Sequence, residues 1–165
     1  MSTTLSEEKK VQRVQEYCRQ TTGTNEWYEH WTNVLTYTDG VKFVAETCGA
    51  YWLIDVVASY QRDPGFRRLL QAGTYRDFQV WRLEPHRDRE GNIDYWVVDA
   101  WTDSPEYPGG EDGPASVRLC RQEIGCSDFP EGLCPDRWKF PQMDKAKLGF
   151  QLWVENGVLL LKEER

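Results

Sequence analysis

The sequence has no long hydrophobic run. No segment approaches the ~18 consecutive apolar residues that a transmembrane helix needs. The chain starts with MSTTLSEEKK, which is polar and contains no apolar segment of the kind found in a secretory signal peptide. These absences argue against export and against a membrane partner, and we expect a cytoplasmic protein.

The sequence also lacks the paired cysteines of a structural zinc site. Cys120, Cys126 and Cys134 lie near one another, and Cys48 or His86 could supply a fourth ligand. Zinc sites usually carry C-x₂₋₄-C pairs, whereas here five and seven residues separate the three cysteines. We therefore predict no metal and no cofactor, with Cys120 buried on a strand. The chain has five cysteines in all, and we expect them to be reduced thiols.

Signatures of catalysis and of phosphate binding are missing too. There is no G-x-S-x-G, G-x-x-x-x-G-K-[ST] or G-x-G-x-x-G motif, and the chain has only two histidines, His30 and His86. The segment DREGNID alternates polar oxygens at Asp88, Glu90, Asn92 and Asp94. It lacks the glycine and the distal glutamate of a calcium-binding EF loop, so we interpret it as a charged hairpin turn.

The chain has fewer basic than acidic residues. Its net charge is −7 and its isoelectric point is about 4.9. Because an acidic surface repels phosphate backbones, general nucleic-acid binding is disfavoured. The composition is that of a globular protein, 39% hydrophobic and 28% charged over 165 residues. We expect a single domain over residues 1–165 that buries its core without a metal or a disulfide.

Helical patterns occupy the first half of the chain. Ser6 is a typical N-cap residue, and Glu7 and Glu8 follow it where the helix dipole favours acids. Asn25 and Asp39 could cap later helices in the same way. Apolar residues recur at helical spacing in each segment. These patterns predict a peripheral helix over Ser6–Gln20 and further helices over Glu26–Leu35, Gly40–Cys48, Ala50–Gln61 and Phe66–Ala72.

The apolar period then changes to two, which is typical of strands. Strands are predicted over Phe78–Glu84, Ile93–Trp101 and Ser116–Ile124. At the C-terminus, Asn156-Gly157 favours a type I′ hairpin turn that pairs Val154 with Leu159 and Leu152 with Leu161. We therefore predict an α+β fold in which N-terminal helices pack on one antiparallel sheet of about five strands, ending in a β-hairpin. Residues 102–115 and 125–147 are predicted to be loop insertions.

Candidate binding residues cluster on the most regular helical pattern of the chain. Asp55 lies inside an apolar run, so a buried Asp55 must be hydrogen-bonded, for example to a loop amide or an arginine. Tyr51 and Ser59 lie one turn away on either side and complete a polar edge. The chain has eight tryptophans, and we expect Trp52 and Trp153 to remain exposed. An exposed tryptophan within a charged rim is typical of an interface hot spot.

Six segments carry a family resemblance: TGTNEWYEH, YTDGVKFVAE, GAYWLIDVVASYQ, FQVWRL, SDFP and NGVLLLKEE. In this order they resemble an uncharacterised family of small domains carried by bacteria, phages and plasmids. The resemblance covers most of Thr22–Glu164 and is most specific over Asp39–Gln61. It implies no activity, cofactor or catalytic residue, but it does imply an accessory role linked to mobile DNA.

Two classes of function follow from these patterns. The first is a non-enzymatic accessory protein or modulator that binds another protein through exposed aromatic side chains. The second is a small enzyme or small-ligand binder with a cleft around Asp55, in which Tyr51 and His30 would have to converge on Asp55. Because catalytic motifs are missing, we favour the first class. Its predicted binding residues are Tyr51, Trp52, Asp55, Ser59 and Trp153.

Overall fold

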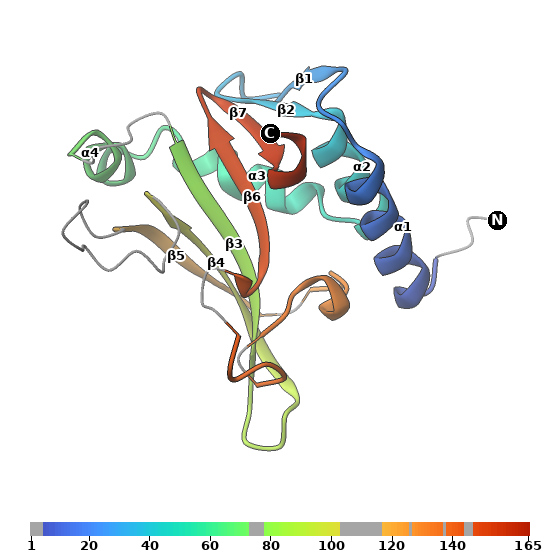
Figure 1. Cartoon of the computed structure of the whole chain (residues 1–165). Helices are drawn as coiled ribbons and strands as arrows, with labels where there is room; N and C mark the ends of the chain where they lie inside the picture. The colour runs from blue at the N-terminus through green and yellow to red at the C-terminus, as the bar shows by residue number, and fades with distance from the viewer. Residues whose placement is uncertain (1–4, 73–77, 103–116, 126, 137, 144–146) are drawn as a thin grey trace.

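A computed structural model describes residues 5–72, 78–102, 117–125, 127–136, 138–143 and 147–165. Within these ranges the chain forms four α-helices and one seven-stranded sheet in the order β1-β2-β7-β6-β3-β4-β5 (Figure 1). Strands β2 and β7 run parallel, whereas the other neighbouring strands run antiparallel. The predicted α+β class is confirmed. The prediction of about five strands, all antiparallel, is wrong, because the sheet has seven strands and is mixed.

Capping side chains fix the ends of the first two helices. Helix α1 (Glu7–Gln20) begins after Ser6, whose hydroxyl accepts a hydrogen bond from the backbone N–H of Lys9. Helix α2 (Asp39–Cys48) begins after Thr38, whose Oγ1 accepts from the N–H of Val41 at 3.2 Å. The cap of α2 is therefore Thr38 and not Asp39, one residue earlier than predicted. Gly49 ends α2 in the left-handed conformation that glycine adopts without strain.

The next two helices follow closely. Helix α3 spans Tyr51–Tyr60 and helix α4 spans Pro64–Ala72. The Asp63 carboxylate accepts a hydrogen bond from the N–H of Phe66 at 2.8 Å, and proline is well suited to the first position of a helix. Helix α4 therefore begins at Pro64, two residues before the predicted start at Phe66.

The helix predicted over Glu26–Leu35 is wrong. This segment contains strand β1 (Trp27–Glu29) and a turn, and strand β2 (Thr36–Thr38) follows. Strand β2 depends on a partner that is distant in the sequence, because it pairs in parallel with β7 near the other end of the chain. No local sequence pattern predicts this pairing. The apolar residues of the segment instead recur at helical spacing, which is why a helix was predicted.

The remaining strands agree closely with the sequence patterns. They are β3 (Phe78–Arg87), β4 (Ile93–Trp101), β5 (Arg118–Ile124), β6 (Phe150–Glu155) and β7 (Val158–Leu161). The predicted hairpin register is confirmed, since Val154 pairs with Leu159 and Leu152 with Leu161. The turn before β4 is also as predicted, with Asp88 Oδ1 accepting from the N–H groups of Glu90 and Asn92.

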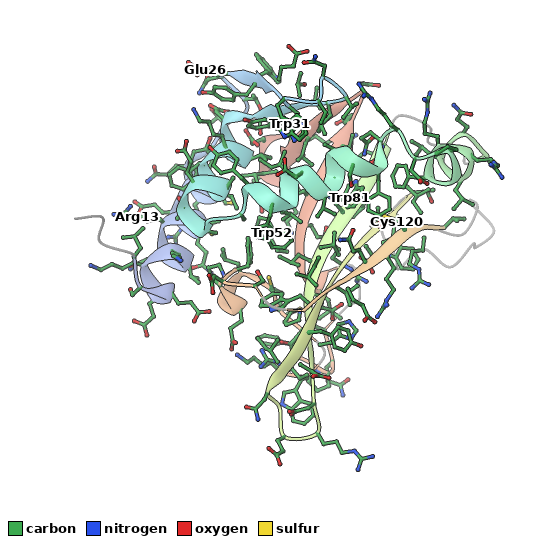
Figure 2. All side chains as sticks on the ribbon, turned by 180° about the vertical axis from the view of Figure 1, so that it is seen from behind. Arg13, Glu26, Trp31, Trp52, Trp81 and Cys120 are labelled. Carbon is green, nitrogen blue, oxygen red and sulfur yellow. The ribbon has the colours of Figure 1, made fainter. Side chains whose placement is uncertain are left out.

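Helices α2 and α3 cover one face of the sheet, and α3 lies across the strands in Figure 2. The core forms between this face and the helices. Trp81 on β3 is almost fully buried there and stacks on Phe66 of α4, with ring centroids 5.8 Å apart. Burial of such large apolar side chains is the main stabilising contribution to the fold. Other core residues include Val41, Val44, Leu53, Ile54, Val57, Leu83, Val98, Leu152, Leu159 and Leu161.

The two predicted loop insertions differ in how much of them is described. Residues 103–116 lie outside the described ranges, so the first insertion is represented by Thr102 alone. The described part of residues 125–147 contains the 3₁₀ helix η1 (Glu131–Leu133). Asp136 in this part is buried and forms an ion pair with Arg87 of β3, with Nε and Oδ2 2.9 Å apart. The second segment is therefore attached to the central sheet.

The hairpin turn between β6 and β7 allows a direct test of how the local sequence determines its conformation. The backbone of Gly157 has a φ of +79°, and residues other than glycine are strained at this angle. We expect Gly157→Ala to lower the free energy of unfolding by about 1 kcal/mol in urea titrations. Gly125→Ala is the matched control, because Gly125 has open space and an ordinary φ. An equal, near-zero effect of both changes would contradict this account of the turn.

Candidate functional site

Three tryptophans of the described chain are more than half exposed: Trp27 (59%), Trp31 (79%) and Trp138 (55%). The prediction that Trp52 and Trp153 are the exposed ones is wrong. Trp52 is only partly exposed and packs against the core. Trp153 is covered by neighbours that the sequence did not reveal: Phe78 packs edge-on against it and the guanidinium of Arg165 lies over its ring.

The most exposed indole, Trp31, is held in place by hydrogen bonds. It lies in the turn between β1 and β2, residues 30–34, which we call the Trp31 turn. Its Nε1 donates to Oδ1 of Asp55 on α3 at 3.3 Å, and the same oxygen lies 2.7 Å from Nε2 of His30. Figure 2 shows Trp31 beside α3. An exposed indole is thus oriented by a hydrogen bond to α3.

The buried His30 anchors this arrangement. Its ring is 4% exposed, and its Nδ1 accepts a hydrogen bond from the backbone N–H of Thr32 at 3.2 Å. Because Nδ1 accepts, Nε2 carries the proton of the neutral ring and donates to Asp55. The Thr32 carbonyl in turn accepts from Nη2 of Arg62 at 2.9 Å. Asp55 and Arg62 therefore bind the Trp31 turn at two points.

The other predicted binding residues of α3 do not join this cluster. The Tyr51 hydroxyl donates to Glu46 at 3.0 Å, and burial together with this carboxylate raises the pKa of Tyr51 to about 12. The Ser59 hydroxyl donates to the carbonyl of Val56 at 2.7 Å. The structure thus brings His30 and Asp55 together, whereas Tyr51 is engaged by Glu46.

The arrangement of Thr32, His30 and Asp55 raises the question of whether these residues catalyse a reaction. The Thr32 hydroxyl oxygen lies 2.7 Å from Nδ1 of His30, so a hydroxyl, an imidazole and a carboxylate follow one another. Nucleophilic sites use this order, but they also need a cavity at the hydroxyl. The hollow beside the Trp31 turn is lined by Asn33 and Arg62, but neither Thr32 nor Asp55 contributes to its lining. The geometry therefore supports the positioning of Trp31 better than it supports a reaction.

The surroundings of the described cysteines disfavour the thiolate form. Burial raises the pKa of Cys18 and Cys48 to about 11 and that of Cys120 to about 12, and it raises the pKa of Cys134 well above its usual value. Among the described side chains, no group of three or more His, Cys, Asp or Glu residues could hold a metal ion. Cys126 lies outside the described residues.

The fold and the site define an α+β domain that presents a fixed, exposed tryptophan. The model of a family of unknown function, DUF6876, matches residues 12–134, so the chain belongs to this family. No curated protein and no solved structure matches the chain. The family match includes the Trp31 turn, α3 and α4, whereas the β6–β7 hairpin follows it. Among the described helices, none has both the length and the apolar character needed to cross a bilayer.

Proposed function

We propose that the protein is a non-enzymatic cytoplasmic binding module that docks on another protein through the Trp31 turn. The observation that carries the proposal is the hydrogen bond between the exposed Trp31 and Asp55, which is itself held by the buried His30. Tryptophan is among the residues that contribute most to protein interfaces. A side chain that is already ordered loses less conformational entropy on binding, so the anchor favours affinity.

The surroundings of Trp31 also suit an interface. Asp55 and Arg62 are polar neighbours at the rim, and Trp27 is a second exposed indole on the adjoining strand β1. An apolar centre within a polar rim is the usual anatomy of a protein–protein contact. The accessory role linked to mobile DNA is a further part of the proposal, and only the sequence resemblance supports it.

The test compares capture by matched tryptophan variants. Wild-type protein, Trp31→Ala and Trp138→Ala would be immobilised and exposed to extract from cells that make the protein. The partner retained by the wild type would then be purified and its Kd measured. We expect Trp31→Ala to weaken binding by at least about 30-fold, since a hot-spot truncation costs about 2 kcal/mol or more.

The control variant replaces an exposed tryptophan at a distant site. Trp138 lies after η1 and packs on Gly91 of the β3–β4 turn, so Trp138→Ala should leave the affinity within about threefold of the wild type. Both variants should unfold at nearly the wild-type temperature, because both indoles are mainly exposed. A partner that binds Trp31→Ala as tightly as the wild type would overturn the proposal.

The alternative function, a small enzyme or small-ligand binder with a cleft around Asp55, retains one supporting observation. The chain from Thr32 through His30 to Asp55 has hydrogen-bonding distances of 2.7 Å at both steps. Covalent labelling of Thr32 by a fluorophosphonate probe, lost in His30→Asn, would favour this alternative. Tyr51, which the alternative required at the same place, instead donates to Glu46.

A further inference from the structure

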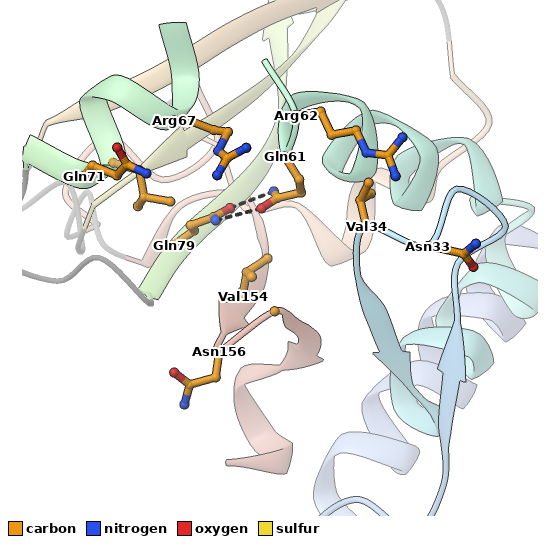
Figure 3. Close-up of a pocket in the computed structure, with 11 residues that line it drawn as sticks. Asn33, Val34, Gln61, Arg62, Arg67, Gln71, Gln79, Val154 and Asn156 are labelled. Atoms are coloured by element: carbon orange, nitrogen blue, oxygen red, sulfur yellow. Dashed lines mark hydrogen bonds between the residues drawn. The ribbon is translucent and has the colours of Figure 1, made fainter. Parts of the chain in front are cut away.

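A polar hollow lies beside the Trp31 turn. It has a volume of about 880 Å³ and lies where the α3–α4 connection, α4, the start of β3 and the β6–β7 turn meet the Trp31 turn (Figure 3). Volumes of this order are typical of small-molecule sites. Residues from five parts of the chain, from Asn33 to Gly157, line the hollow. No local sequence pattern could therefore predict it.

The charge of this hollow is opposite to that of the protein. Its described lining contains two guanidinium groups, Arg62 and Arg67, and no carboxylate, although the chain carries a net charge of −7. Arg62 is held by the carbonyl of Thr32 through one nitrogen and keeps other N–H groups available. The guanidinium of Arg67 makes no hydrogen bond or ion pair with another described residue, and Figure 3 shows it pointing toward the pair of glutamine amides Gln61 and Gln79.

The acid nearest to these arginines in sequence is already engaged. Asp63 caps α4 through the N–H of Phe66, and its backbone carbonyl accepts from the N–H of Arg67. Asp63 is also absent from the described lining of the hollow. The structure therefore places two cations in the lining of the hollow and no carboxylate among its described lining residues.

A pair of glutamines makes a rigid wall. Gln61 and Gln79 exchange two amide hydrogen bonds of 3.0 Å, and Oε1 of Gln79 also accepts from Nε1 of the buried Trp81 at 2.8 Å. Val34 and Leu70, which are half-buried, add apolar surface to the lining. The hollow thus combines a fixed amide wall, an apolar surface and unpaired guanidinium donors.

We propose that this hollow binds a small organic anion through a carboxylate or phosphate group placed between Arg62 and Arg67. Guanidinium groups present planar pairs of N–H donors that match the oxygens of these groups. The Gln61 amide and the side chains of Val34 and Leu70 would contact the uncharged body of the ligand. The proposed anion site shares Arg62 with the rim of the docking surface, but it does not require the Trp31 indole, so the two proposals can fail separately.

The test follows the Nε–Hε signals of the arginines by NMR during titrations with inorganic phosphate and, separately, with citrate. Sodium chloride at matched ionic strength corrects for screening. We expect the Arg62 and Arg67 signals to shift and to saturate in the millimolar range or below with at least one anion. Saturation with phosphate alone assigns a phosphate group, and saturation with citrate alone assigns a carboxylate.

Two variants separate specific binding from general attraction of anions. Arg67→Met should weaken binding by at least about tenfold, the effect of losing charge-assisted hydrogen bonds. Arg121→Met should leave it unchanged, because Arg121 is on β5 and pairs with Glu123. Arg67 is exposed on α4, so its replacement should preserve the fold. Failure of both anions to saturate, parallel shifts at Arg121, or an Arg67→Met titration equal to that of the wild type would overturn the proposal.

Discussion

Glu164→Ala should lower the free energy of unfolding by about 3 kcal/mol. The Glu164 carboxylate lies in the C-terminal 3₁₀ helix η3 (Lys162–Glu164) and is buried. Its Oε1 accepts from the Thr38 hydroxyl at 2.6 Å and from the N–H of Leu161 at 3.0 Å. Its Oε2 accepts from the Thr24 hydroxyl at 3.1 Å and from the N–H of Gly40 at 3.3 Å. One side chain thus satisfies four donors, three of them on residues 24–40, far away in the sequence.

The position of Glu164 at the N-terminus of α2 adds to this effect. A carboxylate near the first turn interacts favourably with the helix dipole and with the free N–H groups there. Alanine would leave the Thr38 hydroxyl and the Gly40 N–H buried without this partner. Urea denaturation measures the loss, and Glu163→Ala in the same short helix is the control, because Glu163 is exposed and should cost less than about 1 kcal/mol.

Gly40 offers a second way to test the same contact. A Cβ built on Gly40 would lie within van der Waals overlap of the Glu164 carboxylate, so Gly40→Ala should be destabilising in the wild type. In the Glu164→Ala background the overlap is gone, and the same change should cost much less. Such non-additivity is expected of residues in contact. Additive effects of the two changes would contradict the proposed contact.

Asp99→Ala should be comparably costly, at about 3 kcal/mol or more. Asp99 of β4 faces Arg82 of β3, and two N–H···O contacts of 3.3 and 3.2 Å join the guanidinium to its carboxylate. The side chains are only 4% (Arg82) and 10% (Asp99) exposed. Removing one partner of a buried ion pair leaves the other charge desolvated, which is more costly than the pair itself is stabilising. Glu84 also approaches Arg82, at 4.0 Å, and should compensate only in part.

The exposed pair of Arg121 and Glu123 is the matched control. Its N···O distance of 3.0 Å is as short as those of the buried pair, but both side chains are substantially exposed. Because water screens such a pair, Glu123→Ala should change the free energy of unfolding by less than about 1 kcal/mol in the same urea titrations. Equal losses for Asp99→Ala and Glu123→Ala would show that burial does not determine the effect.

Local chemistry determined which elements were predictable. The Ser6 cap and the Asn156-Gly157 turn act through neighbouring residues, so α1 and the β6–β7 hairpin were predicted correctly with their positions or register. Strands β1 and β2 were missed because β2 is completed by β7, more than a hundred residues away. A short segment that gains its partners at that distance carries little signal of its own.

The candidate site was predictable in part for the same reason. Asp55 was expected to need a partner if it were buried; its side chain is 55% exposed, and it nevertheless contacts His30 and Trp31. These partners lie on a turn that we had assigned to a helix, so the role of Asp55 in positioning Trp31 was not visible. Arg62 and Arg67 were missed entirely, because their hollow exists only after α4, β3 and the hairpin have come together.

Photo-crosslinking tests the central claim about Trp31 most directly. The crosslinking amino acid p-benzoylphenylalanine would replace the exposed Glu29, which directly precedes the Trp31 turn, in one variant and Trp138 in another, and both would be irradiated in cells that make the protein. The docking account predicts one dominant crosslinked protein from position 29 that position 138 does not yield. Identical product patterns from the two positions, or no product from position 29, would contradict it.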